Sequence, residues 1–169
     1  MPSIDCAPNW YVLYTKHKFE KKTADELTYM NIKNYLPLRT VKRRWSDRIK
    51  SIQVPLFANY VFVQADLKAK GAILGTPGVV KFVCMGGQPS SIGEDEIKKI
   101  QLIEGADCSA EQAPYFSKGD RVKVVNGAFC GIEGTLLRSI NQTRLVVRIP
   151  LLQQAISIEI NSGDIVKIM

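Results

Sequence analysis

The most apolar stretch of the chain is residues 54–63 (Val-Pro-Leu-Phe-Ala-Asn-Tyr-Val-Phe-Val), which is rich in residues that favour strands. We expect one strand over this whole stretch. Successive side chains of a strand point to opposite faces, and here both faces would be apolar, which predicts a central strand covered on both sides. One face bears Tyr60 and Phe62. Their cover could be a helix of the same chain or a partner protein, and the pattern leaves both open.

The rest of the first 105 residues mixes helical and strand patterns without regular alternation. Residues 10–14 and 79–83 read as strands, and residues 67–74 as a short helix that ends at a Gly-Thr-Pro-Gly turn. Apolar positions at helical spacing predict two longer helices, residues 18–30 and a helix from Glu94 to Gly105. Their stripes are Phe19, Thr23, Leu27 and Met30 in the first, and Ile97, Ile100 and Ile103 in the second. We therefore expect an α+β domain with a largely antiparallel sheet flanked by helices.

Residues 39–50 are strongly basic and have Trp45 in their midst. Residues 35–38 before them should be extended, and we expect a hairpin-like excursion that turns near Ser46 and Asp47 and returns through Ile52. A solvated charged loop would explain the charges. The alternative is an arm that follows phosphates, in which Lys and Arg neutralise the backbone and the indole offers a stacking surface.

From residue 118 onward the pattern changes to short strand-like runs separated by Gly and Asn turns. Five such runs predict a small all-β barrel, and they lie at about residues 121–124, 135–140, 143–149, 155–160 and 165–168. The preceding segment is small, polar and without periodicity, which indicates a linker. The expected organisation is a tail over 1–8, a first domain over 9–105, a linker over 106–116 and a second domain over 117–169.

The charge is unevenly distributed over these two parts. The 169 residues carry a net charge of +7, and 46% are hydrophobic, as in a globular protein. Residues 1–104 hold 16 Lys and Arg against 10 Asp and Glu, whereas residues 105–169 hold 7 against 6. A basic first part predicts a polyanion near it.

The sequence offers no pattern typical of catalysis or of a cofactor. The four cysteines are far apart, no Cys-x-x-Cys pair occurs, and His17 is the only histidine, which argues against a metal site and against a catalytic triad. We expect a protein that is not an enzyme, binds no cofactor, and has Cys84 and Cys130 buried as small apolar residues. No secretory signal and no membrane-spanning run are visible, so we expect a cytoplasmic monomer.

Three blocks together resemble one known family. They are residues 10–13 (Trp-Tyr-Val-Leu), residues 55–63, and the run from Gly119-Asp120-Arg121 to Gly134, which is similar to a KOW motif. Residues 76–79 (Thr-Pro-Gly-Val) and 82–83 match in order and spacing. The chain resembles the NusG family of transcription elongation and antitermination factors, including specialised paralogues of the RfaH type. This implies an N-terminal NGN domain and a C-terminal SH3-like KOW barrel.

The resemblance also implies partners and site residues. An NGN domain docks on the clamp helices of RNA polymerase, reaches the gate loop, and thereby suppresses pausing or termination. Tyr60 and Phe62 match the clamp-binding strand, and Phe57 and Met85 are further candidates. Lys16, His17 and Lys22 correspond to positions that face non-template or upstream DNA. Arg43, Arg44 and Arg48 are assigned to this nucleic-acid-facing surface from their charge alone.

Phe129 matches an exposed aromatic residue through which KOW domains contact ribosomal protein S10 or the termination factor Rho. The alternative for Phe129 is a ring that closes the end of the barrel. Two departures stand out: Pro77 replaces a basic residue of RfaH-type proteins, and Ala58-Asn59 replaces the common Pro-Gly. These departures hint at a specialised paralogue. The alternative function is a ribosomal or RNA-binding KOW protein that acts through its basic arm.

Overall fold

The computed structural model describes residues 8–105, 111–113, 119–138 and 143–168. The chain forms two compact units, residues 1–94 and residues 95–169. The fold class is α+β, as predicted: a sheet with helices in the first unit and a strand-rich second unit. Helix α3 (Glu94–Gly105) groups with the second unit, whereas the sequence assigned it to the first domain. The domain limits at 9–105 and 117–169 therefore stay a prediction.

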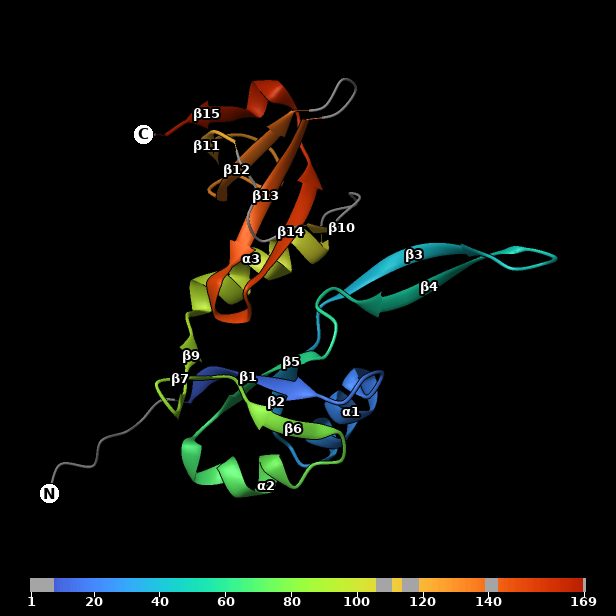
Figure 1. The fold of residues 1–169 in the computed structure, drawn as a ribbon, viewed down its shortest axis with the longest axis vertical. Coiled ribbons are helices and arrows are strands. Elements are labelled where there is room, and N and C mark those ends of the chain that lie inside the picture. The colour runs from blue at the N-terminus through green and yellow to red at the C-terminus, as the bar shows by residue number, and fades with distance from the viewer. Residues whose placement is uncertain (1–7, 106–110, 114–118, 139–142, 169) are drawn as a thin grey trace, which may run out of the picture. The chain divides into compact units, whose positions relative to one another are not determined.

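The first unit is built on an antiparallel sheet in the order β2-β5-β1-β6, with β9 paired to β1 (Figure 1). Its elements are β1 (Asn9–Thr15), α1 (Glu20–Tyr29), β2 (Lys33–Tyr35), β3 (Leu38–Arg44), β4 (Ile49–Pro55), β5 (Tyr60–Ala65), the 3-10 turn Leu67–Ala69, α2 (Lys70–Leu74), β6 (Val79–Phe82), β7 (Cys84–Met85), β8 (Gln88–Pro89) and β9 (Ser91–Ile92). The central position of β5 between β2 and β1 agrees with its apolar sequence.

One face of this sheet, which we call the first face, is covered by α1 and α2. Tyr11 and Leu13 of β1 lie opposite Val63 and Val61 of β5, and these four side chains form one buried cluster with further residues. The cluster includes Leu27 of α1 and Ile73 of α2. The predicted helical stripe is therefore correct at Leu27. It is wrong at Met30, which follows the end of α1 and is exposed.

The predicted single strand over residues 54–63 is wrong, because a turn interrupts it between β4 and β5. Asn59 has a left-handed backbone with a φ of 67°. Its N–H donates to the carboxylate Oε1 of Glu20 at 2.8 Å, and its carbonyl accepts from the N–H of Thr15 at 2.8 Å. A residue with positive φ cannot continue a strand. Asn tolerates this conformation best after Gly, which explains how Asn59 can occupy the turn.

The basic segment forms the predicted hairpin, with β3 and β4 paired from Leu38↔Pro55 to Arg44↔Ile49. The turn contains Ser46 and Asp47, as expected, and the N–H of Trp45 donates to the carbonyl of Arg48 at 2.8 Å. Figure 1 shows this hairpin projecting from the sheet of the first unit.

The second unit holds α3 and a sheet in the order β10-β14-β13-β12-β11-β15. A strand is present at each of the five predicted runs, and residues 139–140 of the second run lie outside the described residues. Helix α3 ends at Gly105 as predicted, and its isoleucine stripe is buried. One further strand, β10, was not predicted. It lies within the expected linker and pairs with β14. The strands are β10 (Glu111–Ala113), β11 (Arg121–Val124), β12 (Glu133–Arg138), β13 (Thr143–Ile149), β14 (Gln154–Glu159) and β15 (Ile165–Lys167), with 3-10 turns at Pro150–Leu152 and Ser162–Asp164.

Candidate functional site

Aromatic rings gather on the second face of the first unit's sheet, which is the face opposite α1 and α2. Tyr14 of β1 lies opposite Tyr60 of β5, and Tyr35 of β2 lies opposite Phe62. The Tyr14 and Tyr60 rings meet edge to face with centroids 5.5 Å apart, and Tyr35 and Phe62 are 6.0 Å apart. The ring of Phe57, from the turn before β5, lies 6.1 Å from Phe62. The structure thus brings together three of the four expected polymerase-binding residues.

These rings differ in exposure, and the sequence did not predict that difference. Phe62 has 0% of its surface exposed and Phe57 has 1%, so neither is presented to a partner in this structure. Of the two covers left open by the sequence, the structure shows the chain itself covering Phe62, and Phe62 as a polymerase contact stays a prediction. Tyr60 and Tyr14 are half-buried and keep part of their surface accessible. Burial, and then the neighbouring Tyr14, raises the pKa of Tyr60 above its ordinary value of 10.0, so this hydroxyl is protonated at neutral pH.

The fourth candidate, Met85, is 68% exposed in the β7–β8 hairpin. Cys84 beside it is also exposed, as is Cys130 in the second unit. The prediction that both thiols are buried is therefore wrong. A polarisable thioether at such a surface suits an adaptable contact with a partner.

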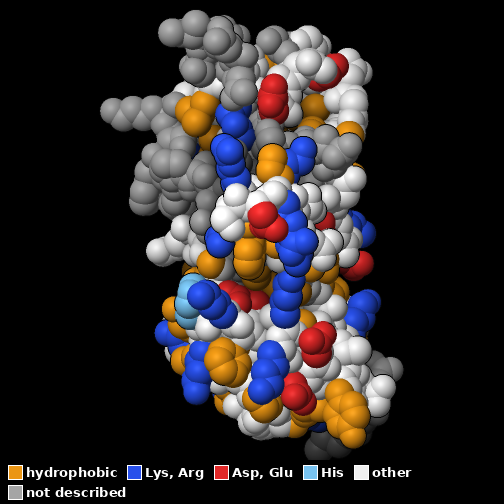
Figure 2. All heavy atoms as spheres, turned by 90° about the vertical axis from the view of Figure 1, so that its right-hand side faces the viewer, with side chains coloured by type: hydrophobic (Ala, Val, Ile, Leu, Met, Phe, Trp, Pro, Cys, Tyr) orange, Lys and Arg blue, Asp and Glu red, His pale blue; other side chains and the backbone are white. Residues whose placement is uncertain are grey.

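The expected nucleic-acid-facing residues occupy two exposed places on the first unit. Lys16 and His17 lie in the turn after β1, where the β1–β6 pairing shifts register between Tyr14 and Thr15. Lys22 follows on α1, with its Nζ 5.8 Å from the ring centroid of Phe19. Figure 2 shows the molecule from the side toward which the β3–β4 hairpin projects. The histidine, in pale blue, lies on this side.

The second place is the outer half of the hairpin itself. Arg43, Arg44 and Arg48 are all exposed, as are the other side chains of residues 42–51. Figure 2 shows Lys and Arg side chains interspersed with hydrophobic ones on this side of the molecule. The exposure of these arginines is consistent with the nucleic-acid-facing surface that their charge predicts. That nucleic acid binds there stays a prediction.

Phe129 lies between β11 and β12 and is only 8% exposed. The expected exposed aromatic contact is thus not what the structure shows, and the buried position agrees with the alternative of a ring that closes the sheet's end. The loop around it is shaped by Gly127 and Gly131, with φ values of 80° and 90°. Phe129 as a contact for S10 or Rho stays a prediction.

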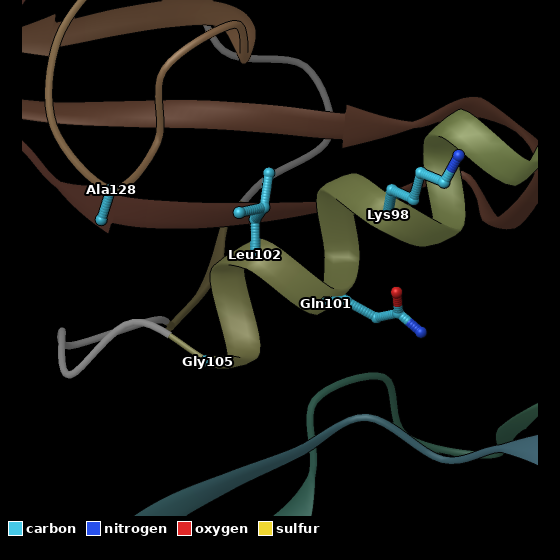
Figure 3. A pocket seen from close by; sticks show the side chains of 5 residues that line it. All are labelled: Lys98, Gln101, Leu102, Gly105 and Ala128. Carbon is cyan, nitrogen blue, oxygen red and sulfur yellow. The ribbon is translucent and has the colours of Figure 1, made fainter.

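The second unit also has a pocket that the sequence did not signal. Its volume is about 440 Å³, and Figure 3 shows residues of α3 with Ala128 of the β11–β12 loop around it. The lining residues are Lys98, Gln101, Leu102, Gly105 and Ala128. No periodicity connects Ala128 to a helix more than twenty residues earlier, so only the fold brings these residues together.

Within the described part of the chain, no group of three or more His, Cys, Asp or Glu side chains is placed to hold a metal ion. The helices of that part are also too short or too polar to cross a membrane.

Comparison with known proteins places the chain among transcription factors. A family model described as "Transcription termination factor nusG" matches residues 8–101, more than half of the chain. A termination/antitermination protein of Streptococcus pyogenes is 30% identical over 142 residues, which cover 76% of this chain and 79% of the relative. One of Thermus thermophilus is 29% identical over 140 residues, which cover 75% of each.

A solved structure described as "Domain interaction in Thermotoga maritima NusG" covers 95% of this chain and 97% of its own, with a TM-score of 0.60 at 23% identity. At that identity the likeness shows the fold alone. It covers both units.

Proposed function

The chain belongs to the NusG family of transcription termination and antitermination factors, and from this premise we propose that it binds RNA polymerase and suppresses pausing or termination. It does so without catalysing a reaction. The observation that carries the proposal is the half-buried Tyr14–Tyr60 pair on the second face, in a chain whose family is shown. Curated relatives are named as termination or antitermination proteins and not as enzymes.

The polymerase contact centres on the accessible part of the second face. Tyr60 presents an aromatic edge with a protonated hydroxyl, and exposed Met85 offers a second apolar contact. Phe62 and Phe57 pack against each other and help to fix the backbone from which Tyr60 projects. A few aromatic residues supply most of the affinity in such interfaces. A helical partner, the clamp helices of the polymerase, suits this apolar surface.

Contact with both the clamp helices and the gate loop would restrain opening of the polymerase clamp. Pausing needs that opening, so a factor that binds the closed form better shifts the population away from paused states. This mechanism needs no chemical step from the chain. The KOW unit recruits a second partner, for which ribosomal protein S10 and Rho are the candidates.

Exposed basic residues of the first unit face nucleic acid in this proposal. Lys16 and His17 lie in the turn between β1 and α1, Lys22 follows on α1, and the hairpin adds Arg43, Arg44 and Arg48. Cations that neutralise phosphates add affinity that falls steeply with salt. Upstream or non-template DNA at the polymerase is the expected ligand.

Binding to purified core polymerase from the same organism tests the proposal. Tyr60→Ala should weaken binding by about thirtyfold, the level of an interface hot spot. Tyr29→Ala is the matched control, because Tyr29 lies on α1 of the same unit and is 86% exposed. Equal affinity of the two variants would rule out the second face as the contact.

A second candidate function follows from the exposed hairpin cations. A ribosomal or RNA-binding KOW protein would use this hairpin directly on RNA. That function predicts tight binding to free RNA and no binding to core polymerase, so the same binding experiment separates the two.

A further inference from the structure

Within the described residues, the hydrogen bonds that anchor the β3–β4 hairpin to the rest of the first unit lie at its base. The N–H of Leu56 donates to the carbonyl of Pro37, and Nζ of Lys21 donates to the carbonyl of Gln53, both at 2.8 Å. Beyond the base, β3 and β4 pair only with each other, and all side chains of residues 42–51 are exposed. A two-stranded ribbon without a packed face gains little stability from burial. The stability of the fold therefore does not explain which side chains this ribbon exposes.

The charges of the ribbon oppose its own pairing. Arg43 lies directly opposite Lys50, and Lys42 and Arg44 occupy the other face. Like charges directly opposite each other are destabilising. The one carboxylate in residues 38–55 is Asp47, which lies 4.0 Å from Arg48. The ribbon thus concentrates positive charge that a polyanion would neutralise.

The tip adds exposed apolar side chains to these cations. Trp45 is 58% exposed and Ile49 is 69% exposed. By strand alternation, Trp45 continues the face of Arg43 and Lys50, and Ile49 shares the face of Arg44. Charged side chains alone would protect the open strand edges against aggregation. An exposed indole at the tip gives no such protection, so this role does not explain Trp45.

We propose that the hairpin tip binds a single-stranded nucleic acid, with the indole of Trp45 stacked on an unpaired base. Arg43 and Lys50, on the same face, neutralise the phosphates that flank this base. Stacking on an aromatic side chain needs an accessible base face, which a duplex hides between its own base pairs. This inference rests on the proposed nucleic-acid-facing role of the hairpin and names its ligand and its stacking residue.

The test compares two oligonucleotides of about 15 nucleotides, within the usual site sizes: oligo-dT and an abasic strand with the same phosphates. Quenching of tryptophan fluorescence by a bound strand reports on Trp45, because the other tryptophan, Trp10, is buried and out of reach of an oligonucleotide. We expect oligo-dT to quench the fluorescence and to bind about tenfold or more tightly than the abasic strand. Fluorescence anisotropy of labelled strands, which does not depend on the indole, measures the variants: Trp45→Ala should remove this preference, and Trp45→Phe should keep most of it. An oligo-U arm distinguishes RNA from DNA as the source of the strand.

The contribution of Arg43 and Lys50 is measured separately, from the dependence of binding affinity on salt concentration. Each lost phosphate contact reduces the slope of log affinity against log salt by about 0.7 for a single strand. We expect this reduction for Arg43→Gln and for Lys50→Gln, and none for Lys70→Gln, which changes an exposed lysine of α2.

Equal affinity for the abasic strand, equal affinity for a duplex, or a Trp45→Ala variant that keeps its preference would each overturn the inference. Such a failure is distinct from failure of the proposed function. Trp45→Ala should bind core polymerase normally when no nucleic acid is present, whereas Tyr60→Ala should not.

Discussion

Replacing Phe62 by alanine tests whether the Phe62 ring is buried in the free chain. Phe62 has no exposed surface, and its ring lies between those of Tyr35 and Phe57 at centroid distances of 6.0 and 6.1 Å. Truncation of a fully buried phenylalanine costs about 3–5 kcal/mol, from lost burial and from the cavity left behind. In a domain of this size each kcal/mol lowers Tm by about 4–8 °C, so Tm should fall by at least about 12 °C.

Thermal unfolding of the full chain, followed by circular dichroism and tryptophan fluorescence, measures this loss. The two units can unfold in separate transitions. Trp10 on β1 identifies the transition of the first unit. Tyr29→Ala is the control and should change stability by no more than about 0.5 kcal/mol. A loss below about 1 kcal/mol for Phe62→Ala would mean that Phe62 is exposed in solution, and the reasoning about its burial would be refuted.

Three further outcomes follow from local geometry. Gly78→Ala should destabilise the first unit by more than about 1 kcal/mol in urea unfolding, because Gly78 has a φ of 93° and a Cβ there would lie 2.5 Å from Oγ1 of Thr23; unchanged stability would contradict this. Asn59→Ala should lower the free energy of unfolding by about 1–2 kcal/mol in the same assay, because alanine disfavours the left-handed backbone of this turn. Asn59→Gly should be nearly neutral, and equal losses for the two variants would contradict this reasoning. Because the folded chain raises the pKa of Tyr60 above 10.0, the unfolded chain releases this proton first, and stability should fall as pH rises above 10.0. Tyr60→Phe should reduce that fall in alkaline unfolding curves, and an identical pH dependence would show that Tyr60 is not its source.

Much of the fold was predictable because local patterns and tertiary structure agree. The β3–β4 hairpin follows from strand-prone residues on either side of Ser46 and Asp47, and the turn residues of the second unit separate its five predicted strands. The error over residues 54–63 has a specific cause. The side chains of Leu56 and Phe57 are apolar because they are buried in a turn, and the break depends on the backbone of Asn59 and its bond to Glu20. That bond joins residues 39 positions apart, so no local pattern reveals it.

The sequence named Tyr60, Phe62 and Phe57 for the candidate site, but it missed Tyr14 and Tyr35 and did not predict which rings are exposed. Hydrophobicity identified Tyr60 and Phe62 as members of one face, and the register of β1 and β5 confirms that they share it. Whether a ring is covered depends on neighbours that arrive from other elements, such as Tyr35 of β2 against Phe62. The same reason explains the buried Phe129 and the exposed Cys84.

The most direct test of the account is the lifetime of a defined pause during single-round transcription by purified core polymerase. The account predicts that the full chain shortens the pause, that Tyr60→Ala loses most of this effect, and that Tyr29→Ala keeps it. A pause unchanged by the full chain, or shortened equally by Tyr60→Ala, would contradict the claim that the second face of the first unit acts on the polymerase.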